Sequence, residues 1–188
     1  MGPDNLSSPQ KGAAQTGAAI VFADEASFRQ DPTLFRTWAR SGQQPHVPTY
    51  GKRNTRHVLG AVSLTGTSFT YRFASTLNGE SYLTFLQQLV NLFAPQPLAV
   101  IADNARYHKH PEVRAWCQAH ADQLRHWFLP PYSPQLNAME RVWGHVRRCA
   151  THNRFFETVP ALVGSLRATF RSIQRRPAAI QGYMAPYQ

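Results

Sequence analysis

Residues 98–103 read Leu-Ala-Val-Ile-Ala-Asp, five apolar residues that end in an aspartate, Asp103. Residues 18–24, Ala-Ala-Ile-Val-Phe-Ala-Asp, have the same form and end in Asp24. Continuous apolar runs of this length are typical of strands that are buried on both faces, as in a parallel sheet. We therefore expect two buried, parallel strands that each present an aspartate at their carboxyl ends, where the ligands of such sheets bind.

The segments around these strands predict the rest of the fold. Residues 57–77 predict two antiparallel strands joined at Thr65-Gly66-Thr67, because short glycine-containing connections favour hairpins. Apolar residues recur at helical spacing from Glu80 to Phe93, and Pro95 follows. Further helices are expected over 111–123, from 137 and over 157–173, with a strand over 124–129 and a long polar loop over 31–56. The fold class is therefore α/β, a mixed five-stranded sheet flanked by helices.

Composition points to a nucleic acid as the partner. The chain has 188 residues, which fits one domain, and a formal net charge of +10 from 20 Lys+Arg against 10 Asp+Glu. Seventeen of the basic residues are arginines, whose planar guanidinium suits bidentate contact with phosphate. A basic surface also occurs in proteins that bind no polyanion. The longest apolar run covers six residues, far fewer than the roughly 20 that cross a bilayer, so we expect a cytoplasmic protein without membrane association.

Three of the ten acids hold special positions: Asp24 and Asp103 after the buried strands, and Glu140 one turn into the helix that starts at Asn137. Carboxylates within about 4 Å of one another repel by several kcal/mol, which a divalent metal offsets. Oxygen ligands suit Mg²⁺ or Mn²⁺, and two such ions support in-line displacement at a phosphodiester. Each acid also has a purely structural interpretation, as a turn or cap residue or, for Glu140, as the partner of Asn137 in a capping box. In a strand Glu25 faces away from Asp24, which favours a salt bridge for Glu25.

The stretch 129–143, Leu-Pro-Pro-Tyr-Ser-Pro-Gln-Leu-Asn-Ala-Met-Glu-Arg-Val-Trp, resembles the block around the third acid of a known family. That family is the DDE-type transposases of bacterial insertion sequences related to mariner elements. Asp24-Glu25 followed by Phe28 resembles its first acidic motif, and Asp103-Asn104-Ala105 with His108 resembles its second. The 37 residues from Asp103 to Glu140 also agree with the family's spacing.

The resemblance implies a ribonuclease H-like catalytic domain over residues 17–188, after a flexible leader over 1–16 that is rich in Gly, Ser, Pro and Gln. It implies that Asp24, Asp103 and Glu140 hold two Mg²⁺ or Mn²⁺ ions, hydrolyse DNA at element ends and join those ends to target DNA. The implied partner is double-stranded DNA, with a homodimer or larger assembly on it. Full-length relatives begin with a helix-turn-helix region, where this chain has a short leader. Three explanations are open: a split reading frame, a truncated gene, or a separate partner chain with that region. The expected location is the cytoplasm, on the nucleoid when DNA is bound.

Several basic residues are candidates for DNA contact, because phosphate contacts supply affinity without sequence choice. The candidates are Lys52, Arg53, Arg56, His108, Arg147 and Arg148. The arginines have the alternative of a solvated surface. His108 has two alternatives, steering the attacking water or lying in a solvated loop. Trp38 and Trp143 are expected to be packing residues rather than platforms for base stacking.

Two other functions remain open. Another ribonuclease H-like nuclease or resolvase would share the three acids but lack the block over 130–143. An inactive remnant of a transposase that only binds DNA would keep the basic charge, although the intact acids argue against it.

Overall fold

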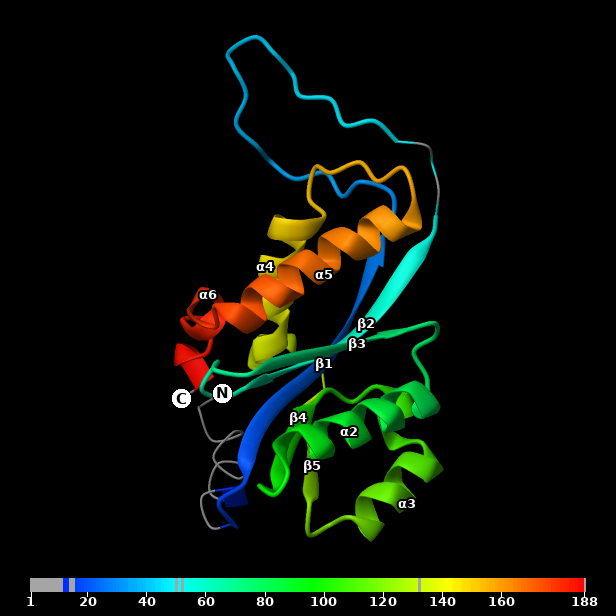
Figure 1. Ribbon diagram of the computed structural model, residues 1–188, viewed down its shortest axis with the longest axis vertical. Coiled ribbons are helices and arrows are strands. Elements are labelled where there is room, and N and C mark those ends of the chain that lie inside the picture. Colours follow the sequence, from blue (N-terminus) through cyan, green and yellow to red (C-terminus); the bar gives the residue numbers. More distant parts are fainter. Residues whose placement is uncertain (1–11, 14–15, 50, 52, 132, 188) are drawn as a thin grey trace.

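A five-stranded sheet of order β3-β2-β1-β4-β5 forms the centre of the computed structural model, which describes residues 12–13, 16–49, 51, 53–131 and 133–187 (Figure 1). β1 and β2 are antiparallel, as are β2 and β3, whereas β4 runs parallel to both β1 and β5. The strands are β1 Ala19–Arg29, β2 Thr55–Ser63, β3 Phe69–Ala74, β4 Leu98–Ala102 and β5 Leu124–Phe128. The mixed sheet, the hairpin and the two parallel central strands are therefore confirmed.

β1 is longer than the apolar run that predicts it. It pairs with β4 over Ala19–Phe22 and with β2 as far as Arg29. Its last residues alternate between buried and exposed, because only the face with Ala26 and Phe28 packs against a core there. The expectation that Asp24 ends the strand is therefore wrong. Asp24 lies within β1, where the pairing with β4 has stopped and the pairing with β2 continues.

Helices cover both faces of the sheet, with α2 and α3 on one side and α4 and α5 on the other (Figure 1). The capping box of Asn78 and Ser81 begins α2, and Thr158 caps α5. The helices are α2 Gly79–Phe93, α3 Pro111–Ala119, α4 Ala138–Ala150, α5 Val159–Arg175 and α6 Ala178–Gln181, with 3₁₀ turns at Arg106–Lys109, Pro134–Leu136 and Ala185–Tyr187. Of the predicted helices, only the one at 111–123 is clearly shorter, since a turn precedes β5.

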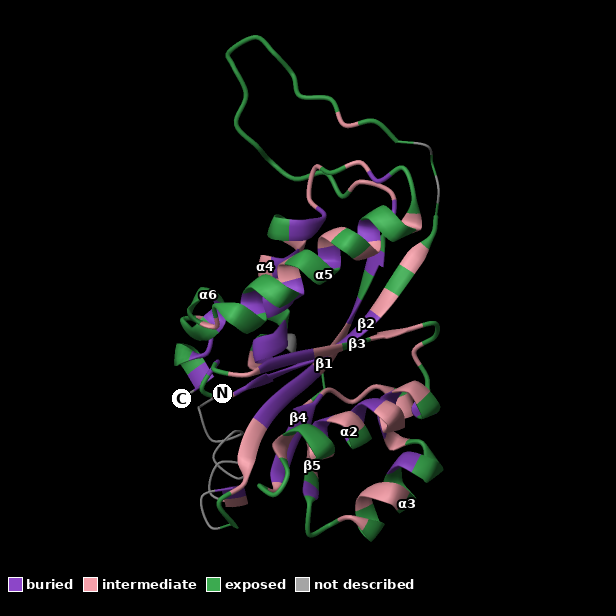
Figure 2. Ribbon diagram, viewed as in Figure 1, coloured by how far each residue is buried: buried purple, intermediate pink, exposed green. Residues whose placement is uncertain are grey.

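Two apolar cores result, one on each face of the sheet. Successive residues of β1 alternate between them, because side chains on a strand alternate in direction. Phe22 and Phe28 pack with α4 and α5, whereas Val21 and Ala23 pack with α2. Figure 2 shows the buried residues along the strands and on the inner faces of the helices.

The described residues between Asp31 and Asn54 extend away from the sheet as a mostly exposed loop (Figures 1 and 2). Trp38 in this loop is 100% exposed, so the prediction that it packs is wrong, whereas Trp143 is buried as expected. The predicted leader lies mostly outside the described residues, but Ala13 within it is buried, which its composition does not predict. Within the described ranges, no helix combines the length and the apolar character needed to cross a membrane.

Candidate active site

Asp24 and Asp103 line one pocket near the centre of the sheet. Each lies two residues beyond the last pair of the parallel register, Phe22 with Ile101. Asp103 is the first residue after β4, and its carboxyl Oδ1 accepts a hydrogen bond from the backbone N–H of Ala105 at 2.9 Å. This contact forms an Asx turn, which fixes the carboxylate at the carboxyl end of the strand.

Trp143 holds Asp24 from the side of α4. Its indole Nε1–H donates to Oδ2 of Asp24 at 3.1 Å. The indole reaches this position because Gly60, the residue opposite Asp24 in β2, has no side chain. A Cβ at Gly60 would lie 2.6 Å from the indole of Trp143 and 2.9 Å from Met139. Gly60 is therefore required for the close approach of α4 to the sheet.

Glu140 lies in the first turn of α4 and is exposed. The helix is capped by the buried side chain of Asn137, which accepts a hydrogen bond from the backbone N–H of Met139 at 3.1 Å. Among the described residues no hydrogen bond joins the Glu140 carboxylate to Asn137, so the alternative of a capping box is not realised. The carboxylate of Glu140 is left for other contacts.

One open pocket of about 450 Å³ brings the three predicted acids together. Asp24 and Asp103 line it from the sheet, and Glu140 lines it from α4. The loop after β5 forms the opposite wall. The other lining residues are Asn104, Ala105, Leu129, Pro130, Pro131, Ser133 and Asn137.

Other carboxylates surround Asp24 at the pocket. Burial raises the pKa of Asp24 to about 8, and the nearby carboxylates of Glu25, Glu140 and Asp103 add to this rise. The pKa of Asp103 is instead lowered, chiefly by its hydrogen bond with His108. One buried acid therefore holds a proton at neutral pH unless a cation approaches it.

These residues belong to a recognisable family. Residues 19–163 match the family described as DDE superfamily endonuclease. The chain belongs to this family. The DDE chain is 25% identical over 167 residues to an uncharacterised 39 kDa protein of insertion element IS630 from Shigella sonnei, and the match covers 87% of this chain and 48% of that protein. It is also 31% identical over 78 residues to an uncharacterised protein of Sinorhizobium fredii, 54% of which is covered. The chain thus spans about half the length of the curated relatives it matches.

Solved structures share the fold of the DDE chain. The mariner Mos1 paired-end complex with Mn superposes with a TM-score of 0.65 at 16% identity, over 96% of this chain and 57% of that one. The catalytic core domain of HTLV-2 integrase in complex with magnesium has a TM-score of 0.56 at 12% identity, over 86% of this chain and 94% of that one. The ribonuclease H-like fold expected from the sequence is confirmed.

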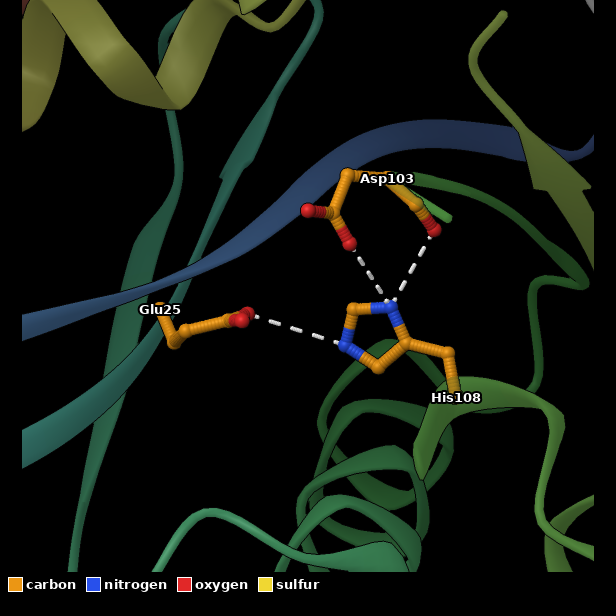
Figure 3. A group of neighbouring side chains, drawn as sticks. All are labelled: Glu25, Asp103 and His108. Atoms are coloured by element: carbon orange, nitrogen blue, oxygen red, sulfur yellow. Dashed lines mark hydrogen bonds and ion pairs between the residues drawn. The ribbon is translucent and has the colours of Figure 1, made fainter. Parts of the chain in front are cut away.

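His108 of the DDE chain is wholly buried, so the expectation of a solvated loop residue is wrong. It lies in the 3₁₀ turn after Asp103, and its Nδ1 is 3.0 Å from Oδ1 of Asp103 (Figure 3). Its Nε2 is 3.6 Å from Oε2 of Glu25, which confirms Glu25 as a salt-bridge partner. Burial opposes charge on His108, but the two carboxylates outweigh this and raise its pKa to about 9. A side chain without exposed surface does not reach a DNA phosphate, so His108 is not among the DNA contacts in this conformation.

Glu25, Asp103 and His108 are also the one group of potential metal ligands, within the described ranges, whose ligand atoms all lie within 4.8 Å of one another. The predicted acids, Asp24, Asp103 and Glu140, line one pocket but do not form such a compact group. Asp103 belongs to both groups, and it lies at the boundary between them.

The basic candidates for DNA contact lie in different places. Lys52 is outside the described residues, and Arg53 is exposed just before β2. Arg147 donates to the backbone carbonyl of Ser27 at 3.3 Å and lies 5.0 Å from the ring centroid of Phe28. Arg56 is exposed in β2 directly opposite Phe28, so the structure brings Arg56 and Arg147 to one end of β1. Arg148 is exposed and instead donates to the Tyr183 hydroxyl at 3.0 Å.

Two residues, Asn104 in the pocket and Lys109 beside it, are not among the predicted site residues, although Asn104 belongs to the second acidic motif. The Asn104 side chain donates to the Leu129 carbonyl and accepts from the Lys109 ammonium. Lys109 also lies 4.9 Å from the ring centroid of Phe128, a cation–π contact. These contacts tie the loop after β5 to the end of β4. In the sequence, Asn104 and Lys109 stand close to Asp103. Only the tertiary fold brings Leu129 and Phe128 against them.

Proposed function

We propose that this chain is the catalytic domain of a DNA transposase, which hydrolyses phosphodiesters at element ends and transfers the resulting strands into target DNA. The observation that carries the proposal is the convergence of Asp24, Asp103 and Glu140 on one open pocket at the carboxyl end of β4. The family membership and the relative from an insertion element support it. An open pocket beside internal strands of the sheet suits a polymer substrate, which enters from the side.

The residues around the pocket fit a divalent metal. Their donors are carboxylate oxygens, the ligands that Mg²⁺ and Mn²⁺ prefer. The raised pKa of Asp24 is a second argument, because a cation would offset the desolvation and the repulsion that cause it. Asp24, Asp103 and Glu140 would hold two such ions. When bound, the metal supplies activation of the attacking oxygen and stabilisation of the leaving oxygen.

The protein groups have separate parts in this proposal. Asp24 and Asp103 provide fixed carboxylates, since Trp143 holds the first and the Asx turn at Ala105 holds the second. Glu140 is exposed and makes no capping contact, which suits a ligand that completes the site when the substrate enters. Lys109, next to Asn104, offers a positive charge at the rim where phosphates would lie.

We further propose double-stranded DNA as the partner and an assembly of two or more chains on it. The Mos1 structures that share the fold are a transpososome and paired-end complexes, which motivates this part. Recognition of the element ends would come from the part of the relatives that this chain does not span, or from a separate chain. The reaction would take place in the cytoplasm on nucleoid DNA.

The test is cleavage of a supercoiled plasmid that carries the element ends, with Mg²⁺ or Mn²⁺, and with strand transfer followed on a pre-cleaved duplex end. Asp24→Asn, Asp103→Asn and Glu140→Gln should each lower the cleavage rate by at least about 100-fold. Asp122→Asn changes an exposed acid remote from the pocket and should behave as wild type. Chelation of the metal should abolish both steps.

Three results would overturn the proposal. Cleavage without any strand transfer would indicate another nuclease or a resolvase. DNA binding without cleavage by the wild-type chain would indicate an inactive remnant. Wild-type cleavage rates in any of the three acid variants would remove that acid from the site.

A further inference from the structure

His108 joins two acids that come from different strands and different faces of the sheet. Its Nδ1 lies 3.0 Å from Oδ1 of Asp103 and 3.2 Å from the backbone carbonyl oxygen of the same residue. A carbonyl oxygen only accepts, so Nδ1 carries a hydrogen. On the other side of the ring, Nε2 faces Oε2 of Glu25 at 3.6 Å (Figure 3). Both ring nitrogens therefore face oxygen acceptors, the arrangement that suits an imidazolium.

Aromatic rings surround His108. Its ring lies 4.0 Å from the ring of Tyr82, 4.5 Å from that of Tyr107 and 6.4 Å from that of His126, all measured between centroids. The Tyr82 hydroxyl forms a hydrogen bond with Nε2 of His126 at 2.9 Å and is not directed at His108. His108 Nε2 and Glu25 Oε2 are buried and form no hydrogen bond within the described chain, so their 3.6 Å contact is an ion pair. This pair is enclosed by aromatic rings from α2, the turn after β4 and β5.

The contacts also define which oxygen of Asp103 is free. Oδ1 receives the His108 contact and the hydrogen bond from the backbone of Ala105 at 2.9 Å. Oδ2 makes no hydrogen bond or ion pair with any described residue, and the Asp103 side chain is 49% exposed at the pocket. Glu25 lies on the face of β1 opposite to Asp24, so His108 approaches Asp103 from behind the pocket.

We propose that His108 is a positioning residue, anchored by Glu25, that fixes Oδ1 of Asp103 and thereby turns Oδ2 toward the metal pocket. The inference rests on the proposed function, in which Asp103 is a metal ligand. In this proposal Glu25 anchors His108 and is not itself a metal ligand. Neither ring nitrogen binds the metal in this proposal. Direct binding by Glu25, Asp103 and His108 is the alternative, and it would require one ring nitrogen to release its hydrogen.

The first test is the affinity of the full chain for Mn²⁺, measured by electron paramagnetic resonance of the free ion. His108→Gln should weaken Mn²⁺ binding about 10-fold to 100-fold, the usual effect of losing a group that orients a ligand. Saturating Mn²⁺ should restore most of the cleavage rate. His120→Gln makes the same change at a histidine whose ring, among the described residues, forms a hydrogen bond with the Trp116 carbonyl alone, and it should leave Mn²⁺ affinity unchanged. Circular dichroism establishes that each variant is folded.

The second test is a double-mutant cycle on thermal stability without metal. Glu25→Gln alone should lower Tm, because it removes the anionic partner of His108. In the His108→Leu background the same change should raise Tm, because it removes a buried carboxylate that has lost its partner. Changes in Tm of opposite sign in the two backgrounds would show that Glu25 and His108 interact. The same change in Tm in both backgrounds would overturn the Glu25 part of the proposal.

The outcomes distinguish this inference from the proposed function. If Asp103→Asn leaves Mn²⁺ affinity unchanged, the proposed function fails, whatever the stability cycle shows. If Asp103→Asn weakens Mn²⁺ binding and His108→Gln does not, only the positioning role fails. If His108→Gln removes Mn²⁺ binding as completely as Asp103→Asn and saturating metal restores nothing, His108 is itself a ligand and the proposal is overturned.

Discussion

Asp24 depends on a single indole for its orientation. Trp143→Phe keeps most of the packing of this buried side chain and removes the Nε1–H that donates to Oδ2 of Asp24. The free energy of unfolding should fall by about 1 kcal/mol, the usual value of one hydrogen bond. The cleavage rate should fall by about 10-fold, because a carboxylate that has lost its orienting partner holds a metal less well. Chemical denaturation and the plasmid assay measure the two effects.

Trp116→Phe is the matched control, since Trp116 is half-buried on α3 and stacks on His120. It should lower stability without changing cleavage at saturating metal. Equal losses of cleavage in both variants would mean that the hydrogen bond to Asp24 has no special part. At this scale the sequence predicts Asp24, Asp103 and Glu140, because each aspartate follows a continuous apolar run and Glu140 lies close to the start of a helix. It does not predict the burial of His108 or the exposure of Trp38, which depend on what the fold brings against each ring.

The contact between α4 and the sheet depends on Gly60. An alanine there would place its Cβ 2.6 Å from the Trp143 indole and 2.9 Å from Met139, both of them buried. Gly60→Ala should therefore lower the free energy of unfolding by about 1–3 kcal/mol, the usual cost of overpacking a core. For a chain of this size that corresponds to a fall in Tm of roughly 2–12 °C. Differential scanning calorimetry gives the value.

Gly164→Ala makes the same chemical change in α5, where a Cβ would meet nothing within 4 Å. It should raise stability by about 0.4–1 kcal/mol, because alanine reduces the entropy of the unfolded chain and favours helix. A loss of stability at Gly164 as large as that at Gly60 would refute the explanation by close approach. Periodicity predicts α4 and α5 as elements, but it does not predict that β1 continues to Arg29, since its last residues alternate and the acids interrupt the pattern.

The order of the strands along the chain predicts much of the architecture of the whole molecule. Two continuous apolar runs predict the parallel centre, and a glycine-containing connection predicts the hairpin at its side. The composition predicts a polyanion partner but does not place the basic side chains. Only the fold shows that Arg56 and Arg147 share one end of β1, while Arg148 turns toward Tyr183.

The placement of Arg147 leads to a prediction about salt. Arg147 lies two helical turns from Glu140 on the same side of α4, about 10 Å along the helix axis, so a duplex in the pocket would pass over it. Each phosphate contact contributes about 0.9 to the slope of log K against log salt concentration. Arg147→Gln should therefore reduce that slope by about 0.9 for a short duplex, measured by fluorescence anisotropy over a series of KCl concentrations. Arg114→Gln removes the same charge from an exposed position on α3, on the opposite face, and should leave the slope unchanged. Equal changes in both variants would show that DNA responds to the net charge of +10 rather than to a defined surface beside the acids.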